Sequence, residues 1–223
     1  MESCRIYFVK KGWFKMKPII IVNFKTYKQG KEAVNLAKQI EKVDKNIIVG
    51  VQASDICEIV KKTELKVYSQ HVDYLEKGRA TGFILPEAVK SEKAIGSFLN
   101  HSEHKLDFDI LKRTIKRCNK IGLKTVVFAS SLMEALKIEK LNPDYLVIEP
   151  PELVGGKISV SKSKPELIEK IKKSLKMNFL VGAGIHSSED VQIAMKLGAL
   201  GIAVSSAICN AKNPMKELKE LIV

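Results

Sequence analysis

Cysteines, aromatic residues and long apolar runs are all scarce in this 223-residue sequence. No apolar run is long enough to cross a bilayer, and residues 1–16 lack the apolar core and small-residue cleavage site of a secretory signal. The cysteines lie far apart, without C-x-x-C or Cys/His ligand spacing, which argues against a zinc site and a disulfide-dense scaffold. They are Cys4, Cys57, Cys118 and Cys209. We therefore expect a reduced, cytoplasmic protein that binds no metal and no membrane.

Acidic residues are also in deficit, since 25 Asp and Glu face 38 Lys and Arg and leave a net charge of +13. Such a charge brings nucleic acid, anionic lipid and phosphorylated metabolites into consideration as partners. The lysines, however, are scattered over segments with helical spacing, such as 31–45 and 164–176, where they are typical of a solvated surface. Aromatic residues make up only 6% of the chain, and no cluster of Lys and Arg residues has aromatic residues interspersed in it. Both observations argue against a nucleic-acid-binding module.

The length of the chain fits a single domain with a large core. The stretch Met16-Lys17-Pro18 directly precedes the first apolar run. We therefore expect translation to start at Met16 and residues 1–16 to be an extension of unknown role or a mis-assigned start, although they could alternatively pack as a short extension. Residues 17–223 are expected to form one catalytic domain.

Short apolar runs rich in β-branched residues alternate along the chain with segments of helical spacing. Eight runs are interpreted as strands: 19–22, 47–51, 66–69, 95–99, 125–128, 145–148, 179–181 and 201–204. Buried strands joined by amphipathic helices imply a parallel sheet with helical crossovers. Eight such units predict the α/β class and a single (β/α)8 barrel. An open doubly wound sheet is the alternative, but it would need no eighth strand and would place a glycine-rich turn after the first strand, where none occurs.

Helix boundary signals agree with this order of elements. They are Asp55, Pro86, Asp107, Pro165 and Ser187 at helix starts, and Gly122 and Gly198 at helix ends. In a barrel, the residues just past the C-terminal ends of the strands converge on one mouth. Polar residues at these positions are therefore the first candidates for a site.

Two of these candidates are a lysine and a histidine. Lys25 follows the first strand beside Asn23, which could orient it, and its ammonium could bind a phosphate or a developing oxyanion. His101 follows the fourth strand, and the Ser102-Glu103 pair after it predicts a helix start. The free N–H groups of that helix would favour a neutral imidazole, which can donate a hydrogen bond to a carbonyl. The other histidines lack a partner motif and are interpreted as surface or structural residues: His71, His104 and His186.

A glutamate and the segment after it form the third candidate. Glu149 ends the sixth strand before Pro150-Pro151, and a partly desolvated carboxylate there could abstract a proton next to a carbonyl. The segment 152–157 has a rigid start, an apolar tip and glycines, as a closing lid needs. An ion pair at the rim and an ordinary turn are the alternative interpretations.

Small residues follow the last two strands. Gly182-Ala183-Gly184 comes after the seventh strand and Ser205-Ser206-Ala207 after the eighth. Exposed backbone N–H groups and a helix N-terminus at such positions can bind an anion. With the lysine, the histidine and the glutamate, these turns predict proton-transfer chemistry on a small phosphorylated carbonyl compound.

Four motifs in fixed order resemble those of the triosephosphate isomerase family. They are Asn23-Phe24-Lys25, Asn100-His101-Ser102-Glu103, Glu149-Pro150-Pro151-Glu152-Leu153 and Gly182-Ala183-Gly184-Ile185. The resemblance extends from Lys17 to Val223, and further matches are to the short archaeal form of the family. These are Gln70-His71, Leu85-Pro86-Glu87-Ala88, Asn142-Pro143-Asp144-Tyr145 and Ser159-Val160-Ser161-Lys162. The resemblance implies a TIM barrel that assembles as a homotetramer, with a dimer as the alternative.

The resemblance also implies interconversion of dihydroxyacetone phosphate and D-glyceraldehyde 3-phosphate through an enediolate, in glycolysis and gluconeogenesis, with no metal and no organic cofactor. Carried over to this sequence, Glu149 is the proton acceptor and His101 the electrophile. Lys25, beside Asn23, binds the substrate and offsets its charge, and Glu103 is a supporting carboxylate. The other substrate-binding residues it implies are Phe24, Val154, Gly155, Gly184, Ser205 and Ser206, with Gly156 completing the lid.

The sequence departs from the archaeal pattern in the lid and after the eighth strand, and His104-Lys105 replaces a more usual basic pair after the histidine motif. The lid reads Val154-Gly155-Gly156-Lys157 where Ile-Gly-Thr-Gly is usual, and Ser205-Ser206-Ala207 stands where Ala-Ser-Gly is usual. Both keep small side chains and backbone donors, so we expect altered loop kinetics or affinity rather than lost activity.

Two other hypotheses stay open at this point. An isomerase of the same fold for another phosphorylated sugar would have no reason to carry the trio Lys25, His101 and Glu149. A catalytically inactive interaction protein would be expected to lose at least one of the three, and all are present.

Overall fold

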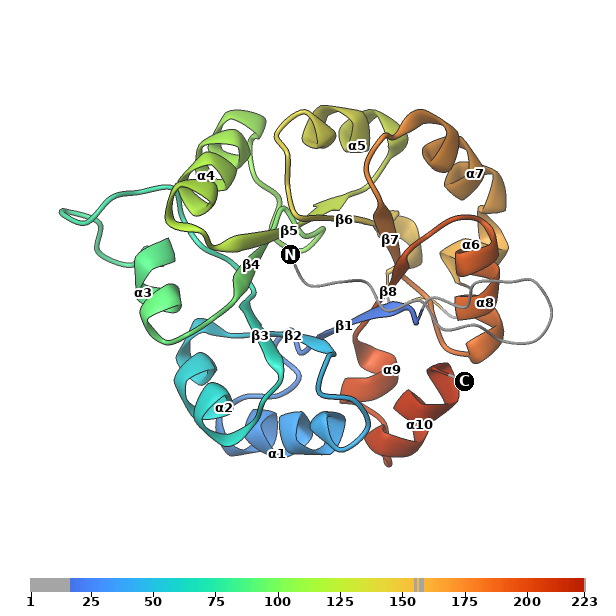
Figure 1. Cartoon of the computed structure of the whole chain (residues 1–223), viewed down its shortest axis with the longest axis horizontal. Helices are drawn as coiled ribbons and strands as arrows, with labels where there is room; N and C mark the ends of the chain where they lie inside the picture. The colour runs from blue at the N-terminus through green and yellow to red at the C-terminus, as the bar shows by residue number, and fades with distance from the viewer. Residues whose placement is uncertain (1–16, 155, 157–158, 223) are drawn as a thin grey trace.

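The computed structural model describes residues 17–154, 156 and 159–222, so the predictions for residues 1–16 lie outside the described residues. Eight parallel strands close into a barrel in which the last strand pairs with the first (Figure 1). They are β1 (Ile19–Asn23), β2 (Ile48–Val51), β3 (Lys66–Ser69), β4 (Gly96–Leu99), β5 (Lys124–Ala129), β6 (Tyr145–Ile148), β7 (Phe179–Gly182) and β8 (Gly201–Val204). The closed sheet confirms the predicted barrel and excludes the open doubly wound sheet.

Every predicted strand is present, and each boundary falls within one residue of the prediction. Continuous apolar, β-branched runs of this length can be buried on both faces only in a sheet covered by helices. The register between the closing strands aligns Ile21 with Ala203 and Val22 with Val204.

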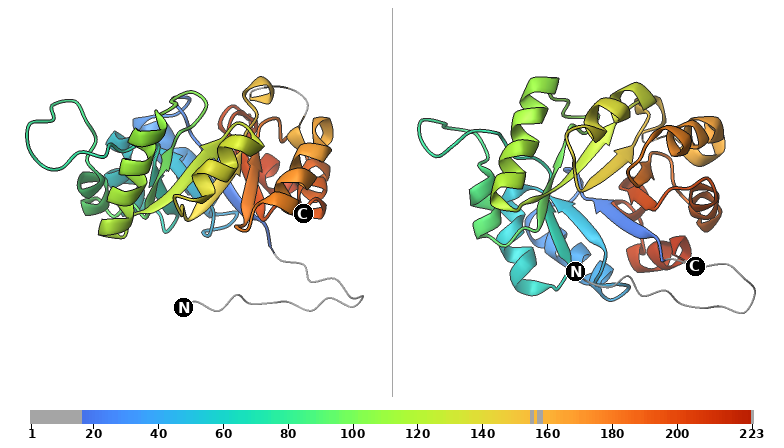
Figure 2. Two further views of the ribbon diagram at one scale, coloured as in Figure 1. Left: turned by 90° about the horizontal axis from the view of Figure 1, so that it is seen from above. Right: turned by 45° about the horizontal axis from the view of Figure 1, so that its top comes forward.

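The helices lie outside the barrel, as Figure 2 shows in two further views. They are α1 (Gly30–Glu41), α2 (Ile56–Lys62), α3 (Pro86–Ser91), α4 (Phe108–Ile121), α5 (Leu132–Glu139), α6 (Val160–Ser163), α7 (Pro165–Ser174), α8 (Ser188–Lys196), α9 (Ser206–Cys209) and α10 (Pro214–Leu221), with 3-10 turns η1 (Ala53–Asp55) and η2 (Pro151–Leu153). None of the described helices is long and apolar enough to span a membrane.

The helix boundary signals at Asp55, Pro86, Asp107, Pro165, Ser187, Gly122 and Gly198 fall at helix ends, with one change of role. Ser187 and Asp190 form a reciprocal capping box at the start of α8, and Gly122 ends α4 in the left-handed region at φ +68°. Asp55 precedes α2, but its side chain does not cap that helix. Its Oδ1 atom instead accepts the N–H of Gly30, 3.0 Å away, and so ties the start of α1 to the loop after β2.

Two hydrophobic layers hold the barrel together. Ile21, Phe98 and Leu180 point inward and belong to a small cluster inside the barrel, whereas Val22 and Val181 point outward into the larger cluster beneath the helices. This alternation follows from the two-residue period of a strand. Each fully buried side chain of this size contributes about 1.5–3 kcal/mol of transfer free energy, so the barrel is a rigid frame for the residues at its mouth.

The connection between β3 and α3, residues 70–85, stands out from the barrel at one side (Figures 1 and 2). Its base is fixed by hydrogen bonds from the Asp73 N–H to the Ile84 carbonyl, 2.8 Å, and from the Ile84 N–H to Asp73 Oδ2, 2.7 Å. The guanidinium of Arg113 on α4 covers the Tyr74 ring at 3.7 Å. Phe83, near the end of this connection, is 54% exposed.

Candidate functional site

The C-terminal ends of the strands bring the predicted reactive residues to one mouth of the barrel. Asn23 is the last residue of β1, and His101 and Glu149 follow β4 and β6. All three are at least nine-tenths buried. Residues from opposite sides of the sheet meet here because parallel strands all end at the same rim.

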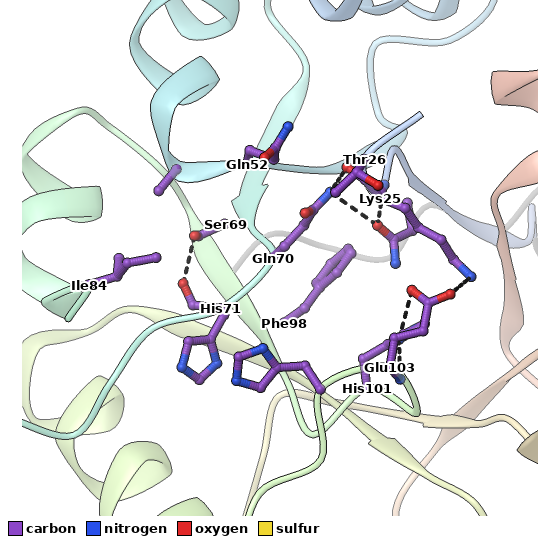
Figure 3. Close-up of a pocket in the computed structure, with 13 residues that line it drawn as sticks. Lys25, Thr26, Gln52, Ser69, Gln70, His71, Ile84, Phe98, His101 and Glu103 are labelled. Carbon is purple, nitrogen blue, oxygen red and sulfur yellow. Dashed lines mark hydrogen bonds and ion pairs between the residues drawn. The ribbon is translucent and has the colours of Figure 1, made fainter. Parts of the chain in front are cut away.

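Lys25 is held by the backbone and by two amide side chains. Its N–H donates to Asn23 Oδ1 at 2.9 Å, and the Nε2 atom of Gln70 donates to the Lys25 carbonyl at 2.8 Å. The residue has a φ of +46°, in the left-handed region that costs a non-glycine residue roughly 1–2 kcal/mol. Its Nζ atom forms a 2.7 Å ion pair with Glu103, and its side chain is only 13% exposed (Figure 3). The backbone of Lys25 is therefore fixed by two hydrogen bonds, and Glu103 holds its ammonium at the mouth.

Phe24, expected to bind substrate, lies in the hydrophobic core with no exposed surface. Its N–H donates to the Gly50 carbonyl at 2.9 Å, and its own carbonyl accepts the N–H of Tyr27 at 3.1 Å. Both its side chain and its backbone groups therefore face the protein. Phe24 anchors Asn23 and Lys25 rather than lining the cavity.

The hydrogen bonds around His101 define its tautomer. The N–H of Glu103 donates to His101 Nδ1 at 3.1 Å, so this nitrogen is an acceptor and the ring proton resides on Nε2. Nε2 lies 3.0 Å from Oε2 of Glu149. The ring also packs edge-on against Phe128, with 4.8 Å between centroids. A neutral imidazole thus presents one N–H donor to the centre of the mouth.

The predicted helix start at Ser102-Glu103 is wrong. These residues form a turn, closed by the hydrogen bond from the His104 N–H to the His101 carbonyl at 2.8 Å, and α4 begins only at Phe108. The expected backbone donor is nonetheless supplied, because the turn leaves the Glu103 N–H free to bond the imidazole. A Ser-Glu pair is a helix-start signal only when an apolar helical run follows directly, and here four residues separate the pair from α4.

Glu149 lies in a pocket whose space depends on a glycine of the neighbouring strand, Gly182 at the end of β7. Its carboxylate is 9% exposed, and the Ser102 hydroxyl lies 3.5 Å from Oε2. A Cβ atom on Gly182 would lie 2.9 Å from Oε1 of Glu149, closer than such contacts normally come. The absence of a side chain at Gly182 therefore allows the carboxylate to lie between β6 and β7.

The chain after Glu149 is described as far as Val154, and again at Gly156, whereas Gly155 lies outside the described residues. Pro151 starts the short η2 turn, and Glu152 forms an ion pair with Lys164 at the start of α7. The carbonyl of Gly156 is 2.8 Å from His186 Nε2 in the loop after β7. The segment thus reaches toward the predicted phosphate turn.

The turns after β7 and β8 are the places where the sequence predicts an anion site. Ala183 and Gly184 both have positive φ values, +75° and +65°. Ser206 is the first residue of α9, and Ser205 precedes it. Within the described part of the chain, the buried Ser205 Oγ atom has no hydrogen-bond partner. Backbone and hydroxyl donors therefore gather at these two strand ends.

A cavity of about 310 Å³ opens beside Lys25 and His101, lined on its far side by residues that the motifs did not select (Figure 3). His71 and His104 stack there with 4.3 Å between ring centroids. His71 Nε2 lies 3.2 Å from Asp73, but burial outweighs this partner and lowers the pKa of His71. The Gln70-His71 match was the only sequence signal for this wall. Among the described residues, no group of three or more His, Cys, Asp or Glu side chains could hold a metal ion.

Comparisons with known proteins agree on one family. The family model described as triosephosphate isomerase matches residues 18–222. A triosephosphate isomerase from Saccharolobus solfataricus is 43% identical, over 92% of this chain and 95% of its own length. Those from Methanobacterium bryantii and Methanocaldococcus jannaschii are 39% and 37% identical, and each match covers more than nine-tenths of both chains.

Proposed function

Since the chain belongs to the triosephosphate isomerase family, and so is an aldose-ketose isomerase of triose phosphates, we propose roles for the residues at its barrel mouth. Glu149 takes a proton from the carbon next to the substrate carbonyl. The same carboxyl group returns that proton to the neighbouring carbon, while the hydroxyl proton passes between the two substrate oxygens by way of His101 Nε2. Together these two transfers convert dihydroxyacetone phosphate into glyceraldehyde 3-phosphate or the reverse. The carboxylate is regenerated in each cycle, and no other reactant is consumed.

His101 acts as the electrophile in this proposal. Its Nε2–H donates a hydrogen bond to the carbonyl oxygen and stabilises the negative charge that develops on the enediolate. The bond from Glu103 N–H to Nδ1 supports this role, because it keeps the proton on the nitrogen that faces Glu149. Donor and base thus lie 3.0 Å apart and can act on adjacent atoms of one substrate.

Lys25 supplies the positive charge that the reaction needs. Its ammonium binds the dianionic substrate and offsets the charge of the enediolate, while Asn23 orients its backbone. Glu103 holds Nζ at 2.7 Å and acts as the supporting carboxylate. A largely buried ammonium next to an exposed carboxylate can exchange that partner for a substrate oxygen at little cost.

The substrate phosphate binds at Gly184, Ser205 and Ser206, where we propose that backbone N–H groups and the Ser205 hydroxyl donate to its oxygens. The positive φ values after β7 and the unpartnered Ser205 Oγ support this. Val154 and Gly155 complete the site as a lid that keeps water from the enediolate. We expect the departures from the archaeal pattern in these two segments to alter lid kinetics or phosphate affinity.

The observation that carries the assignment of roles is the 3.0 Å contact between His101 Nε2 and Glu149 Oε2, both buried at the mouth. The test is a coupled assay of dihydroxyacetone phosphate formation with wild type and Glu149→Gln. The substitution keeps the shape of the side chain and removes the base. Glu139→Gln is the matched control, because Glu139 binds two backbone N–H groups near the start of β7, away from the mouth.

We expect Glu149→Gln to lose a factor of about 10²–10⁴ in kcat, the usual contribution of a positioned base, while Glu139→Gln keeps its activity. A Glu149→Gln protein with wild-type kcat would overturn the assignment of the base. It would leave the membership of the family untouched.

We further propose that the protein self-associates, as a homotetramer or else a dimer. The projecting connection 70–85 and its exposed Phe83 support an interface at this side of the barrel. Sedimentation equilibrium should give four or two times the 24.9 kDa of one chain. Phe83→Asp should lower that mass, and a wild-type protein that sediments at 24.9 kDa at micromolar concentration would refute the proposal.

The cytoplasm is the compartment we propose for this enzyme, in glycolysis and gluconeogenesis. The three cysteines among the described residues, Cys57, Cys118 and Cys209, are free and support a reducing environment. Burial raises the pKa of Cys118 and of Cys209 to about 12, so these two thiols are inert. Fractionation of source cells, with the isomerase activity followed in each fraction, is the direct test.

A further inference from the structure

The residue before His101 is held in an unusual backbone conformation. Asn100 has a φ of +59° and is 2% exposed at the end of β4. Asparagine tolerates the left-handed region better than other non-glycine residues, yet it still needs support from its surroundings. This single residue sets the direction in which the chain leaves the strand and therefore the direction of the imidazole.

Three hydrogen bonds fix the Asn100 side chain. Its Nδ2 atom donates to the Phe128 carbonyl at 2.8 Å and to Glu134 Oε1 at 2.7 Å, and its Oδ1 atom accepts the N–H of Leu106 at 3.1 Å. Both Nδ2 protons therefore have acceptors that cannot donate in return. A flipped amide would point Oδ1 at a carbonyl and a carboxylate, so only one orientation of Asn100 is compatible with Glu134.

Glu134 is itself held from three sides at the start of α5. Its carboxylate accepts the N–H and hydroxyl of Ser130 and an ion pair from Lys105 at 2.8 Å, besides the bond from Asn100. Burial raises its pKa, but the bonds from Lys105, Ser130 and Asn100 outweigh burial and hold the pKa at about 2. The group is thus a fixed anion at neutral pH.

The network connects directly to the imidazole. The Phe128 carbonyl accepts from Asn100, and the ring of the same phenylalanine packs edge-on against His101 at 4.8 Å. The bond from Leu106 to Asn100 closes the loop that carries His101, Ser102 and Glu103. A rotation of the Asn100 amide would therefore shift both the ring and the Glu103 N–H that defines its tautomer.

We infer that Glu134 is a positioning residue for the isomerase reaction, which acts through Asn100 to hold His101 in register with Glu149. The inference rests on the role proposed for His101. Glu134 touches neither the imidazole nor Glu149 in any of its contacts. Its effect must therefore appear in the geometry of the electrophile rather than in substrate binding.

A merely structural role is the competing explanation, because Glu134 also lies in the first turn of α5, where its N–H is capped by Ser131. Glu139 at the other end of the same helix is a matched control. Its carboxylate also accepts hydrogen bonds from residues distant in the sequence, namely the N–H groups of Lys176 and Met177 at 2.7 and 2.8 Å. These bonds lie far from the mouth. Loss of either glutamate should destabilise the protein by a similar amount.

The experiment compares Glu134→Ala, Glu134→Gln and Glu139→Ala by steady-state kinetics and thermal melting. We expect Glu134→Ala to lower kcat about ten- to a hundredfold with KM within about threefold of wild type, as a small misplacement of a catalytic group does. Glu134→Gln keeps an acceptor for Asn100 and should recover most of that loss. Glu139→Ala should lower the melting temperature and leave kcat unchanged.

A double-mutant cycle tests the route through Asn100. Asn100→Gly keeps the positive φ without strain but removes the amide. If Glu134 acts through that amide, Glu134→Ala should cause no further loss of kcat in the Asn100→Gly background. The ¹⁵N chemical shifts of His101 should move in Glu134→Ala and stay in place in Glu139→Ala.

Three results would overturn the inference: equal kcat in Glu134→Ala and wild type, additive losses in the cycle, or unshifted His101 signals in Glu134→Ala. If Glu134→Ala does not fold, Glu134→Gln takes its place. The side-chain oxygen of the glutamine can still accept from Asn100, so a Glu134→Gln enzyme as slow as Glu149→Gln would also overturn the inference. The proposed function fails separately, because that failure requires an active Glu149→Gln.

Discussion

His101 Nε2 lies 3.0 Å from Glu149 Oε2, while Nδ1 of the same ring accepts the N–H of Glu103 at 3.1 Å. One imidazole thus contacts both the base and the backbone group that fixes its tautomer. His101 follows β4 and Glu149 follows β6, and these two strands are not neighbours in the barrel. Their contact depends on the inward direction of both strand ends, so substitutions that disturb either direction should affect the chemical step before they affect folding.

Replacing His101 with Gln removes the ring donor but keeps a polar side chain of similar reach. We expect kcat to fall by roughly 10²–10³, as the loss of one donor to a developing oxyanion does. KM should change little, because the phosphate contacts that we propose lie after β7 and β8. The measurement is a full kinetic profile with a thermal melt. A His101→Gln enzyme within twofold of wild-type kcat would exclude His101 as the electrophile.

Replacing Lys25 with Met should impair both binding and catalysis. The contact between the Lys25 ammonium and the bound substrate is a buried charge contact in our proposal. Its loss should cost about 2–5 kcal/mol of binding free energy, which corresponds to a decrease in kcat/KM of roughly thirtyfold or more. Stability should change little, since the partner Glu103 is 56% exposed and remains solvated. Lys45→Met is the control, because Lys45 pairs with Glu64 on the exposed surface. Equal kinetics in the two variants would argue against the proposed role of Lys25.

Gly182→Ala tests the space around the base. The new Cβ would lie 2.9 Å from Glu149 Oε1, so the carboxylate must shift by a few tenths of an ångström. We expect kcat to fall about tenfold or more, because catalysis depends steeply on the position of the base. The free energy of unfolding should fall only slightly.

Gly96→Ala is the contrast to Gly182→Ala. A Cβ on Gly96, at the start of β4, would lie 2.2 Å from the Tyr68 ring and 2.5 Å from the Lys124 carbonyl, at the opposite end of the strand from His101. This variant should lose stability, while its folded fraction keeps its kcat. If Gly182→Ala were as active as wild type, the pocket around Glu149 would be looser than the contacts indicate.

The sequence predicts the frame of the site because its signals are local. Apolar β-branched runs define the eight strands, and Lys25, His101 and Glu149 each stand within two residues of a strand end. Once the barrel closes, their convergence follows from topology alone. The same logic predicts phosphate-binding turns after β7 and β8, and the turn after β7 contains Ala183 and Gly184 at positive φ values.

The supporting contacts could not be predicted, because they join residues distant in the sequence. Gln70 reaches the Lys25 carbonyl 45 positions away, and Glu134 reaches Asn100 across 34 positions. Neither residue belongs to a reactive motif. The helix expected at Ser102-Glu103 failed for a different reason. The N–H groups of Glu103 and Leu106 donate to the nearby side chains of His101 and Asn100, and these local bonds hold a turn in place of a helix.

Asp190 should make the stability of the protein depend on pH. Its carboxylate caps α8, accepts the N–H groups of His186 and Ser187 at 3.0 Å, and accepts the Ser159 hydroxyl at 2.8 Å. Burial raises its pKa, but these bonds and the ion pair with Lys162 outweigh burial and lower the pKa from 3.8 to about 2. A lowered folded-state pKa means that the charged form stabilises the fold.

The sign and range of this effect follow from the two pKa values. The contribution of Asp190 is fully present above the unfolded pKa of 3.8 and is lost as the pH falls through about 2. It amounts to about 2 kcal/mol at pH 7 and about half of that at pH 3. Asp190→Asn should therefore be less stable than wild type by about 2 kcal/mol at pH 7, with a difference about half as large at pH 3.

Urea denaturation of both proteins between pH 3 and pH 7 measures this difference. Glu64→Gln is the control, because Glu64 is 73% exposed in its ion pair and should change the free energy of unfolding little at any pH. Since Ser159 follows the proposed lid in the sequence, Asp190→Asn should also raise KM by removing an acceptor that ties Ser159 to α8. A gap between Asp190→Asn and wild type that stays constant from pH 7 to pH 3 would show that the carboxylate acts by its shape alone and not by its charge.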